Sequence, residues 1–300
     1  MKKTSIGGQA VIEGVMMKGP EDIAIAVRKP DGEIALKKEK LKSNRKKISK
    51  TPIIRGIFAF IDSMVIGVKA LSYSAEFFEE EEEKPDKKPT KFENFMEKNM
   101  IPIAVVLSIA FSVGMFILLP TFAVSLLAPV AKKPIIMNMM EGIIRIIIFI
   151  SYIAIISKMK DIARVFEYHG AEHKSIFCYE NGEELTVENV RKYTRLHPRC
   201  GTSFLFIVMI VSILLFSLFK WPNILVRVVT RIALLPIVAG ISYEIIKWAG
   251  RSDSKLVSIV SAPGMWLQKI TTREPDDSQI EVAIEALKNV LVEDKDADLW

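Results

Sequence analysis

The three histidines of this 300-residue chain all fall between positions 169 and 197. His169 and His173 belong to the segment YHGAEHK, in which Glu172 directly precedes the second histidine. Residues four positions apart on an α-helix share one face, so both imidazoles can bind one metal ion. Glu172 would then lie beside a water on that ion and act as its general base. The order H-x-x-E-H is that of the inverzincin peptidases.

Further metal ligands are available elsewhere in the chain. The segment HPRC supplies His197 and Cys200, Glu244 lies near the end of a later apolar stretch, and Glu13 lies in the glycine-rich segment GGQAVIEGVMMKGP. Imidazole, thiolate and carboxylate groups are the ligands that zinc binds in proteins. We therefore predict a zinc site that contains His169 and His173 together with His197 or Cys200. Glu244 and Glu13 are additional candidates.

Two other interpretations fit the same residues. The histidines could be ordinary residues of a helix beside the membrane, and HPRC could cap the helix that follows it. A zinc site closed by four protein ligands would be structural, whereas a site that keeps a position for water would be catalytic. The spacing of these residues fits each alternative.

Long apolar stretches indicate a membrane protein. Half of the residues are hydrophobic, and the mean hydropathy is +0.27. A helix needs about 20 apolar residues to cross the hydrocarbon core of a bilayer. Four stretches approach that length, and they occupy residues 101–130, 135–157, 202–219 and 224–248. The links within the first pair and within the second pair are short, so we predict two helical hairpins, with Pro120 as a kink or break in the first stretch.

The charged residues inside these stretches lead to two predictions. Glu141 and Arg145 are spaced to pair across one helical turn. Arg227 and Arg231 lie near one end of the last stretch, from which long side chains can reach water. Two cysteines, Cys178 and Cys200, are too few for a disulfide framework, and we expect both to be reduced.

The distribution of basic residues predicts the orientation. The segment 37–50 and the segment 158–201 each carry eight lysines or arginines. Because positive residues favour the cytoplasmic side, we place both segments and both termini there. The stretch 52–78 has one polar residue every seven positions (Arg55, Asp62, Lys69 and Glu76), which forms a polar stripe. We predict an amphipathic helix in the membrane interface there, because a further crossing would separate the two basic segments.

The N-terminal region has the pattern of short strands. Residues 6–41 contain alternating apolar residues on both sides of a PDG turn, which is typical of a β-hairpin. The predicted fold is an all-α polytopic membrane protein, with four transmembrane helices as two hairpins and a small cytosolic β-containing region. The expected segments are the β-containing region with its basic segment (1–50), interfacial helix (51–78), charged linker (79–100), first hairpin (101–157), cytosolic loop (158–201), second hairpin (202–248) and helical tail (249–300).

Five segments of the chain resemble the YqhQ family of bacterial multi-pass membrane proteins. In order they are GGQAVIEGVMMKGP, YHGAEHKSIFCYE, HPRCGTSFL, SYEIIKWAGR and APGMWLQKITTREPDDSQIEVAIEAL. The family is a domain of unknown function that has been described as a predicted metal-dependent enzyme. The resemblance implies a place in the bacterial cell membrane. It also carries over as candidate site residues His169, Glu172, His173, His197 and Cys200.

Two classes of function follow. The first is a zinc-dependent hydrolase at the cytoplasmic membrane face, with Glu172 as general base. The second is a scaffold or assembly factor without enzymatic activity, which docks a cytosolic or membrane-insertion partner. The basic segment 37–50 suits anionic lipid or the RNA of a ribosome equally well on charge alone. We expect contact with the lipid bilayer and no specific binding of DNA, and the sequence leaves an oligomer open.

Overall fold

A computed structural model of the protein describes residues 3–41, 51–78, 90–126, 134–219, 223–250 and 254–292. The chain forms two compact units. Unit 1 contains Met1–Phe77, Tyr152–Ser212 and Leu234–Trp300, and unit 2 contains Phe78–Ser151 and Ile213–Ala233. Part of the basic segment (42–50), half of the charged linker (79–89) and the two links between the apolar stretches (127–133 and 220–222) lie outside the described residues.

The N-terminal strands form one antiparallel sheet in unit 1. Its strands are β1 (Gly7–Val11), β2 (Gly14–Lys18), β3 (Asp22–Arg28) and β4 (Ile34–Lys40), and they lie in sequence order. The predicted hairpin at the PDG turn is confirmed, since β3 pairs with β4 from Arg28 opposite Ile34 onward. The glycine-rich segment forms the hairpin of β1 and β2, in which Val11 lies opposite Gly14.

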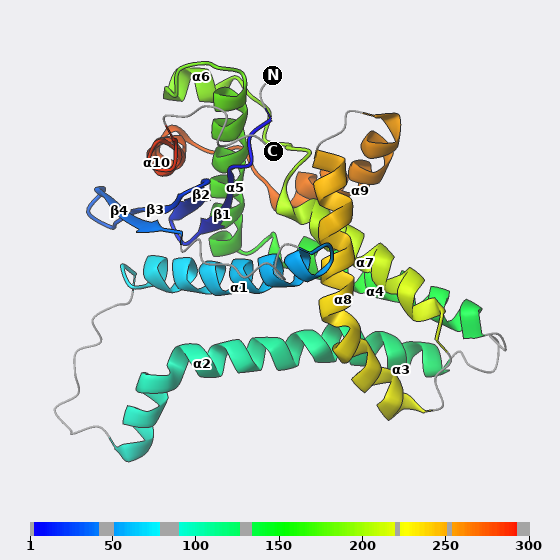
Figure 1. Ribbon diagram of the computed structural model, residues 1–300. Helices are drawn as coiled ribbons and strands as arrows, with labels where there is room; N and C mark the ends of the chain where they lie inside the picture. The colour runs from blue at the N-terminus through cyan, green and yellow to red at the C-terminus, as the bar shows by residue number, and fades with distance from the viewer. Residues whose placement is uncertain are drawn as a thin grey trace. The chain divides into compact units, whose positions relative to one another are not determined.

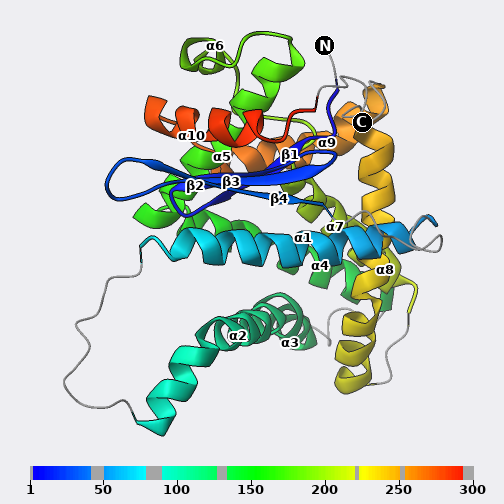
Figure 2. The same cartoon turned by 60° about the vertical axis from the view of Figure 1, so that its left-hand side comes forward.

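Helices cover both faces of this sheet, as Figures 1 and 2 show. Helix α1 (Ile54–Ala75) packs on one face, where Ala70 joins a cluster with Val11, Met16 and Ile25. Helices α5 (Lys160–Glu180) and α10 (Asp277–Lys288) pack on the other face, against residues that include Val15 and Met17. Successive side chains of a strand point to opposite faces. The side chains of the unbroken apolar run in β2 therefore pack alternately against the helices on both faces of the sheet. The sheet is therefore an inner layer and positions α5.

Helix α1 also contacts the second half of helix α8 (Ile224–Gly250). A Cβ atom at Gly56 would lie 2.9 Å from the Cα of Gly240, so the two backbones approach closely at this pair of glycines. Arg55 forms an ion pair with Glu244 beside this crossing. Large apolar side chains of α1, among them Phe58, are exposed.

Three helical segments are long and apolar enough to cross a membrane, and they are Pro102–Leu126, Ile135–Ile156 and Leu225–Gly250. The first runs through α2 (Lys91–Val113), a π-helical turn η2 (Gly114–Leu118) and α3 (Leu119–Leu126), so the helix continues past Pro120. The second belongs to α4 (Pro134–Ile156) and the third to α8. The fourth predicted stretch forms α7 (Gly201–Ser217), which has 17 residues and is shorter than these three.

The described chain is therefore mostly helical, with one small sheet and three candidate membrane spans. The remaining helices belong to unit 1. They are the short α6 (Val187–Arg191) and α9 (Lys255–Thr271), which precedes α10 in the tail.

Unit 2 buries charged side chains between its helices. The predicted pair is present, since Arg145 Nη2 lies 3.3 Å from Glu141 Oε1. The expectation that Arg227 and Arg231 reach water was wrong. Both are buried, at 8% and 2% exposure, and both donate hydrogen bonds to the Glu141 carboxylate. Burial of a carboxylate without partners would cost several kcal/mol of stability. The arginines of α8 therefore point inward and pair with Glu141.

Candidate metal centre

Helix α5 carries the H-x-x-E-H segment in its buried middle. His169, Glu172 and His173 share one face of the helix, as their spacing predicts. On another side, a Cβ atom at Gly170 would lie 2.0 Å from the carbonyl oxygen of Arg273, so only glycine allows the segment after α9 to approach so closely. This approach brings the carbonyl of Thr271 to the imidazole of His169.

Backbone carbonyls orient both imidazoles. His169 Nδ1 lies 2.8 Å from the carbonyl oxygen of Thr271, and His173 Nδ1 lies 2.6 Å from that of Arg195. A carbonyl only accepts hydrogen bonds, so each Nδ1 carries the proton and donates it. In the neutral rings the free lone pair is then on Nε2. This is the second-shell arrangement that metal-binding histidines use to fix their tautomer.

Cys200 completes a cluster of three donors. It lies just before α7, and its Sγ is 3.2 Å from His169 Nε2. One donor atom from each of His169, His173 and Cys200 lies within 4.8 Å of the other two. Zn–S and Zn–N bonds of ordinary length in a tetrahedron separate sulfur from nitrogen by about 3.5 Å. The three donors therefore fit a zinc ion with small adjustments, and we call them the His–Cys cluster.

The electrostatics of the cluster favour a thiolate. Burial opposes the charged form of Cys200, but His173 and His169 hold the pKa of its thiol well below its usual range. Burial likewise opposes an imidazolium at His169, yet the Cys200 thiolate raises the pKa of that imidazole to about 9. The backbone N–H of Thr202 also donates to the sulfur, at 3.4 Å. Thiolate is the form of cysteine that binds metals.

Glu172 lies beside this cluster and close to β1. A Cβ atom at Gly8 would be 2.8 Å from its carboxyl carbon, so the glycine makes room for the carboxylate. Its Oε2 is buried and has no hydrogen-bond partner among the described residues. Burial raises the pKa of Glu172, although His169 and His173 oppose that rise. Glu172, His169 and Cys200 line one cavity together with Gly8 and Gln9.

His197 lies near the cluster, but its ring nitrogens are close to other groups. Its Nδ1 accepts from the backbone N–H of Arg199 at 3.3 Å, and its Nε2 is 3.5 Å from Glu180 Oε2. Burial lowers the pKa of His197, so the ring is neutral. Gln268 fixes its backbone, because its side chain accepts from the His197 N–H at 2.7 Å and donates to the His197 carbonyl at 2.8 Å. Of the two alternatives from HPRC, the structure brings Cys200 into the His–Cys cluster and leaves His197 outside it.

The two additional acidic candidates lie away from the cluster. Glu13 occupies the turn between β1 and β2, where it forms an ion pair with Arg164 and accepts from the hydroxyl of Tyr168 at 3.2 Å. Glu244 accepts from Arg55 and from the backbone N–H of Ile53. Each carboxylate joins two structural elements. Neither is among the three grouped donors.

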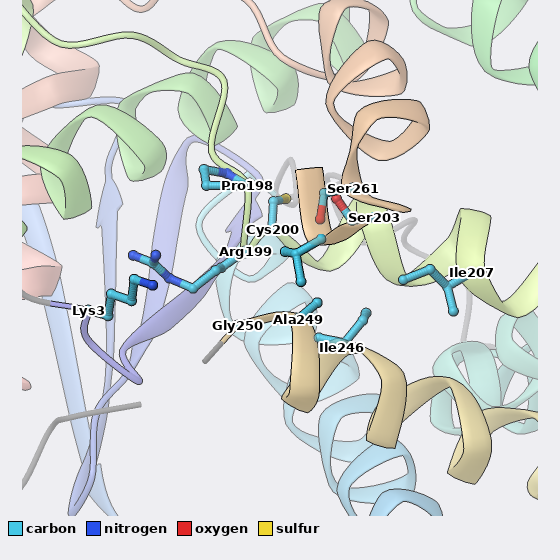
Figure 3. Close-up of a pocket in the computed structure, with 11 residues that line it drawn as sticks. Lys3, Pro198, Arg199, Cys200, Ser203, Ile207, Ile246, Ala249, Gly250 and Ser261 are labelled. Atoms are coloured by element: carbon cyan, nitrogen blue, oxygen red, sulfur yellow. The ribbon is translucent and has the colours of Figure 1, made fainter. Parts of the chain in front are cut away.

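A second cavity is also lined by Cys200, and Figure 3 shows the residues around it. It has a volume of about 230 Å³, and α7, α8 and α9 form its apolar walls through residues such as Ile207 and Ile246. Lys3 and Arg199 lie together at one side of it. The hydroxyl of Ser203 is buried at its wall and has no partner among the described residues. Cys200 thus borders two cavities, one that Glu172 lines and one between α7, α8 and α9.

The sequence did not indicate four residues that shape the site. Thr271 and Arg195 act through backbone carbonyls, which every residue has, so no residue type marks them. Gln268 acts through a long-range pair of hydrogen bonds. Gly8 belongs to the pair Gly7–Gly8, and paired glycines are typical of a close backbone approach, so its residue type does carry a local signal.

The fold and the site define a mostly helical protein with candidate membrane spans and a cluster of two histidines and a cysteine. Residues 51–293 match the family described as "Protein of unknown function (DUF1385)". Over 294 residues the chain is 38% identical to "Uncharacterized protein YqhQ" of Bacillus subtilis (strain 168), which covers 95% of this chain and 92% of that protein. The chain belongs to this YqhQ family. No solved structure matches it.

Proposed function

We propose that this protein is a membrane hydrolase that holds a zinc ion between His169, His173 and Cys200. The observation that carries the proposal is the orientation of the two imidazoles. Each Nδ1 is bonded to a backbone carbonyl, so each ring has its lone pair on Nε2 when it is neutral, and a thiolate-forming cysteine lies beside them. Two nitrogens and one sulfur are a donor set that suits zinc.

The number of protein donors favours a catalytic centre. Structural zinc sites are closed by four protein ligands, whereas catalytic ones use three and keep a position for water or substrate. His197 is engaged by Arg199 and Glu180, and Glu13 and Glu244 by arginines. These residues do not supply a fourth ligand in this arrangement.

The residues around the cluster have distinct roles in this proposal. Zinc bound there would supply Lewis-acid activation of a water and of a substrate carbonyl or phosphoryl group. Glu172 would accept a proton at Oε2, the buried oxygen without a partner, and return it to the leaving group. Burial raises its pKa toward neutrality, which suits a group that both accepts and releases a proton. The apolar cavity beside Cys200 would hold the part of the substrate that does not react.

The proposal includes a topology of four membrane crossings. Helix α7 carries no charged residue over its 17 residues, which is at the short end of the range for a transmembrane helix. With α7 as a crossing, the basic segments 37–50 and 158–201 and both termini lie on one side of the cell membrane, the cytoplasm. Helix α1, with its exposed apolar side chains, would lie in the interface. Reporter fusions after residues 41, 130, 180 and 221 would test this assignment.

A scaffold with structural zinc is the second candidate. One observation favours it, because the cluster and its partners join four segments that are distant in sequence, namely α5, the loop at Arg195, the start of α7 and the end of α9. Glu172→Gln separates the two functions. In a hydrolase it abolishes activity and leaves zinc in place, whereas in a scaffold it leaves cellular function unchanged.

The test of the zinc site is metal analysis of the full chain purified in detergent. We expect about one zinc per wild-type chain, and loss of zinc in His169→Ala and in Cys200→Ala. Cys178→Ala is the matched control. Cys178 is buried and is not one of the three grouped donors, so this variant should retain zinc. A well-folded wild-type protein that neither contains zinc nor takes it up would refute the proposal.

A further inference from the structure

The cavity between α7, α8 and α9 has apolar walls and a polar end. Its volume is about 230 Å³. Each of the three helices contributes an apolar side chain to the walls, namely Ile207, Ile246 and Val257. Lys3 and Arg199 lie together at one side of the cavity (Figure 3). This arrangement matches an amphiphile, which has one polar and one apolar end.

Two residues at the cavity have buried donors without partners. Ser203 is 5% exposed, and its hydroxyl has no hydrogen-bond partner among the described residues. Arg199 binds Glu180 through Nη2, but its Nε has no partner in the part of the chain that the structure describes. A buried donor without an acceptor lowers the stability of a protein. Ligand oxygens that accept hydrogen bonds from these two groups would remove that cost.

The charges at the cavity favour an anionic oxygen group. The described residues that line it include two cations, Lys3 and Arg199, and no acidic residue. Arg199 pairs with Glu180, and its guanidinium keeps further donors for a second oxyanion. Hydrogen bonds between a charged donor and an anion are stronger than those between neutral groups. The polar end of a ligand should therefore be a carboxylate or a phosphate rather than a hydroxyl.

The level of the cavity along its helices indicates a lipid. At about 1.5 Å per residue, Ser203 lies about 3 Å and Ile207 about 9 Å from the start of α7. On the same scale, Ile246 lies about 6 Å before the end of α8. Trp248 on α8 and Trp266 on α9 are exposed, and tryptophan is enriched where a membrane meets water. In the proposed topology, the polar end faces the cytoplasmic headgroups and the apolar walls lie toward the hydrocarbon core.

The size of the cavity favours one hydrocarbon chain. Sites for drug-sized ligands have volumes of about 300–1,000 Å³, so a cavity of about 230 Å³ is too small for the two chains of a phospholipid. Helix α9 closes one side of it. A Cβ atom at Gly264 would lie 2.6 Å from the Cα of Ser203, so α9 approaches the start of α7 closely.

We propose that this cavity binds a single acyl chain that ends in an anionic oxygen group. The chain lies between α7, α8 and α9, and the oxygens accept hydrogen bonds from Arg199 and Ser203. A free fatty acid and an anionic lysophospholipid share this chemistry. Because Cys200 lines both cavities, the site would hold the acyl chain of a lipid substrate beside the His–Cys cluster. That use rests on the proposed function, whereas the binding itself does not require zinc.

The experiment is photo-cross-linking of the full chain in neutral detergent, as purified and after removal of zinc. The probe is a long-chain fatty acid with a diazirine in its chain, and the comparison probe is the alcohol of the same chain. We expect adducts on peptides that contain Ile207 or Ile246, with about tenfold more adduct from the acid than from the alcohol. Equal labelling by the two probes, or no adduct on these peptides, would overturn the proposal.

Two substitutions on α8 test the position of the chain. Ala249→Phe adds a ring at the wall of the cavity and should abolish these adducts. Ala233→Phe is the matched control, because Ala233 is exposed on the same helix and does not line the cavity, so labelling should be unchanged. A folded Ala249→Phe protein that is labelled like the wild type would contradict the proposal.

Ser203→Ala is the decisive variant at the polar end, because Arg199→Gln would also break the ion pair with Glu180. Ser203→Ala removes a hydroxyl that has no partner among the described residues, so the fold should be retained. The preference for the acid over the alcohol should fall severalfold. A folded Ser203→Ala protein with the full preference would contradict the proposal.

Unlabelled competitors identify the source of the chain. Displacement of the probe by palmitate but not by lysophosphatidylglycerol assigns the free acid, and the reverse assigns the lysophospholipid. Metal analysis of the same samples separates the two proposals. Labelling of the cavity in protein that binds no zinc would support the cavity and refute the zinc centre. Zinc binding without labelling would overturn the cavity and leave the zinc centre in place.

Discussion

The His–Cys cluster and the buried ionic cluster of unit 2 accommodate polar groups in different ways. We call the ionic cluster, which contains Glu141, Arg145, Arg227 and Arg231, the arginine cluster. In the His–Cys cluster, backbone carbonyls bind Nδ1 of both histidines, so each neutral imidazole has its lone pair on Nε2. In the arginine cluster, three arginine side chains contact one carboxylate, that of Glu141. Backbone partners fix orientation and leave donor atoms for a ligand, whereas an ionic cluster fixes helices to one another. The first arrangement suits a metal ion, and the second suits the packing of helices.

Removal of the one acid of the arginine cluster should have the largest effect on stability. Glu141→Gln leaves three buried arginines without a carboxylate, and breaking a buried ion pair costs about 3–5 kcal/mol. We expect a large fall in the melting temperature of the protein in detergent. Glu244→Gln is the control, because its ion pair with Arg55 is partly exposed and should contribute less. Equal falls in melting temperature for the two substitutions would contradict this difference between a buried and a partly exposed ion pair.

Near the His–Cys cluster, Glu180 should contribute the next largest amount. It is buried and binds Arg199 and the backbone N–H of Thr4, so Glu180→Gln should cost about 3 kcal/mol at neutral pH. Burial alone would raise the pKa of Glu180, but His197 and Arg199 hold it below its ordinary value of 4.5. Its contribution is therefore complete above pH 4.5 and is lost as the pH falls through the lower pKa of the folded state.

The pH dependence of unfolding measures this contribution. The free energy of unfolding of the wild type should fall below pH 4.5 more steeply than that of Glu180→Gln, and the two curves should converge in acid. A constant difference between them across this range would show that the carboxylate is not the group that titrates.

Substitution of Gly8 should lower the stability by an intermediate amount, through contacts beside the His–Cys cluster. In Gly8→Ala the new Cβ atom would lie 2.7 Å from the carbonyl oxygen of Met16 and 2.8 Å from the Glu172 carboxyl carbon. Overpacking of this kind costs about 1–3 kcal/mol and should displace Glu172. Gly7→Ala is the matched control, since no atom lies within 4 Å of its added Cβ. Thermal unfolding of the two variants compares them, and equal melting temperatures would disprove the close approach.

The last prediction concerns the reactivity of the two cysteines. In metal-free protein, iodoacetamide should react with Cys200 at neutral pH, because the histidines stabilise its thiolate. Burial raises the pKa of Cys178 to about 11, so its alkylation should increase about tenfold per pH unit up to that value. Mass spectrometry of tryptic peptides reports both reactions. Faster alkylation of Cys178 than of Cys200 at pH 7 would contradict the stabilisation of the Cys200 thiolate by the histidines.

Local patterns predicted much of this structure. The spacing of His169, Glu172 and His173 placed them on one helix face, and the PDG turn placed the hairpin of β3 and β4. Both depend on contacts within a few residues. The apolar stretches were found because membrane crossing depends on length and composition. The shorter α7 shows the limit of that approach, since helix ends depend on neighbouring segments.

Long-range partners were beyond prediction from the sequence. The position of His197 outside the three grouped donors depends on Gln268, which binds the His197 backbone and is 71 residues away. The inward direction of Arg227 depends on Glu141, which is 86 residues away on another helix. Snorkelling was expected because a local rule considers only the distance to the helix end. The identity of a partner from a distant segment decided both outcomes.

Cobalt substitution tests the central claim most directly. Cobalt(II) replaces zinc at such sites and shows an intense near-ultraviolet absorption only when a thiolate is bound to it. We expect this band in the wild type and in Cys178→Ala, and its loss in Cys200→Ser. The band should remain in Glu172→Gln, because Glu172 is a base and not a ligand. Cobalt binding without the thiolate band, or with a band that survives in Cys200→Ser, would contradict the proposed centre.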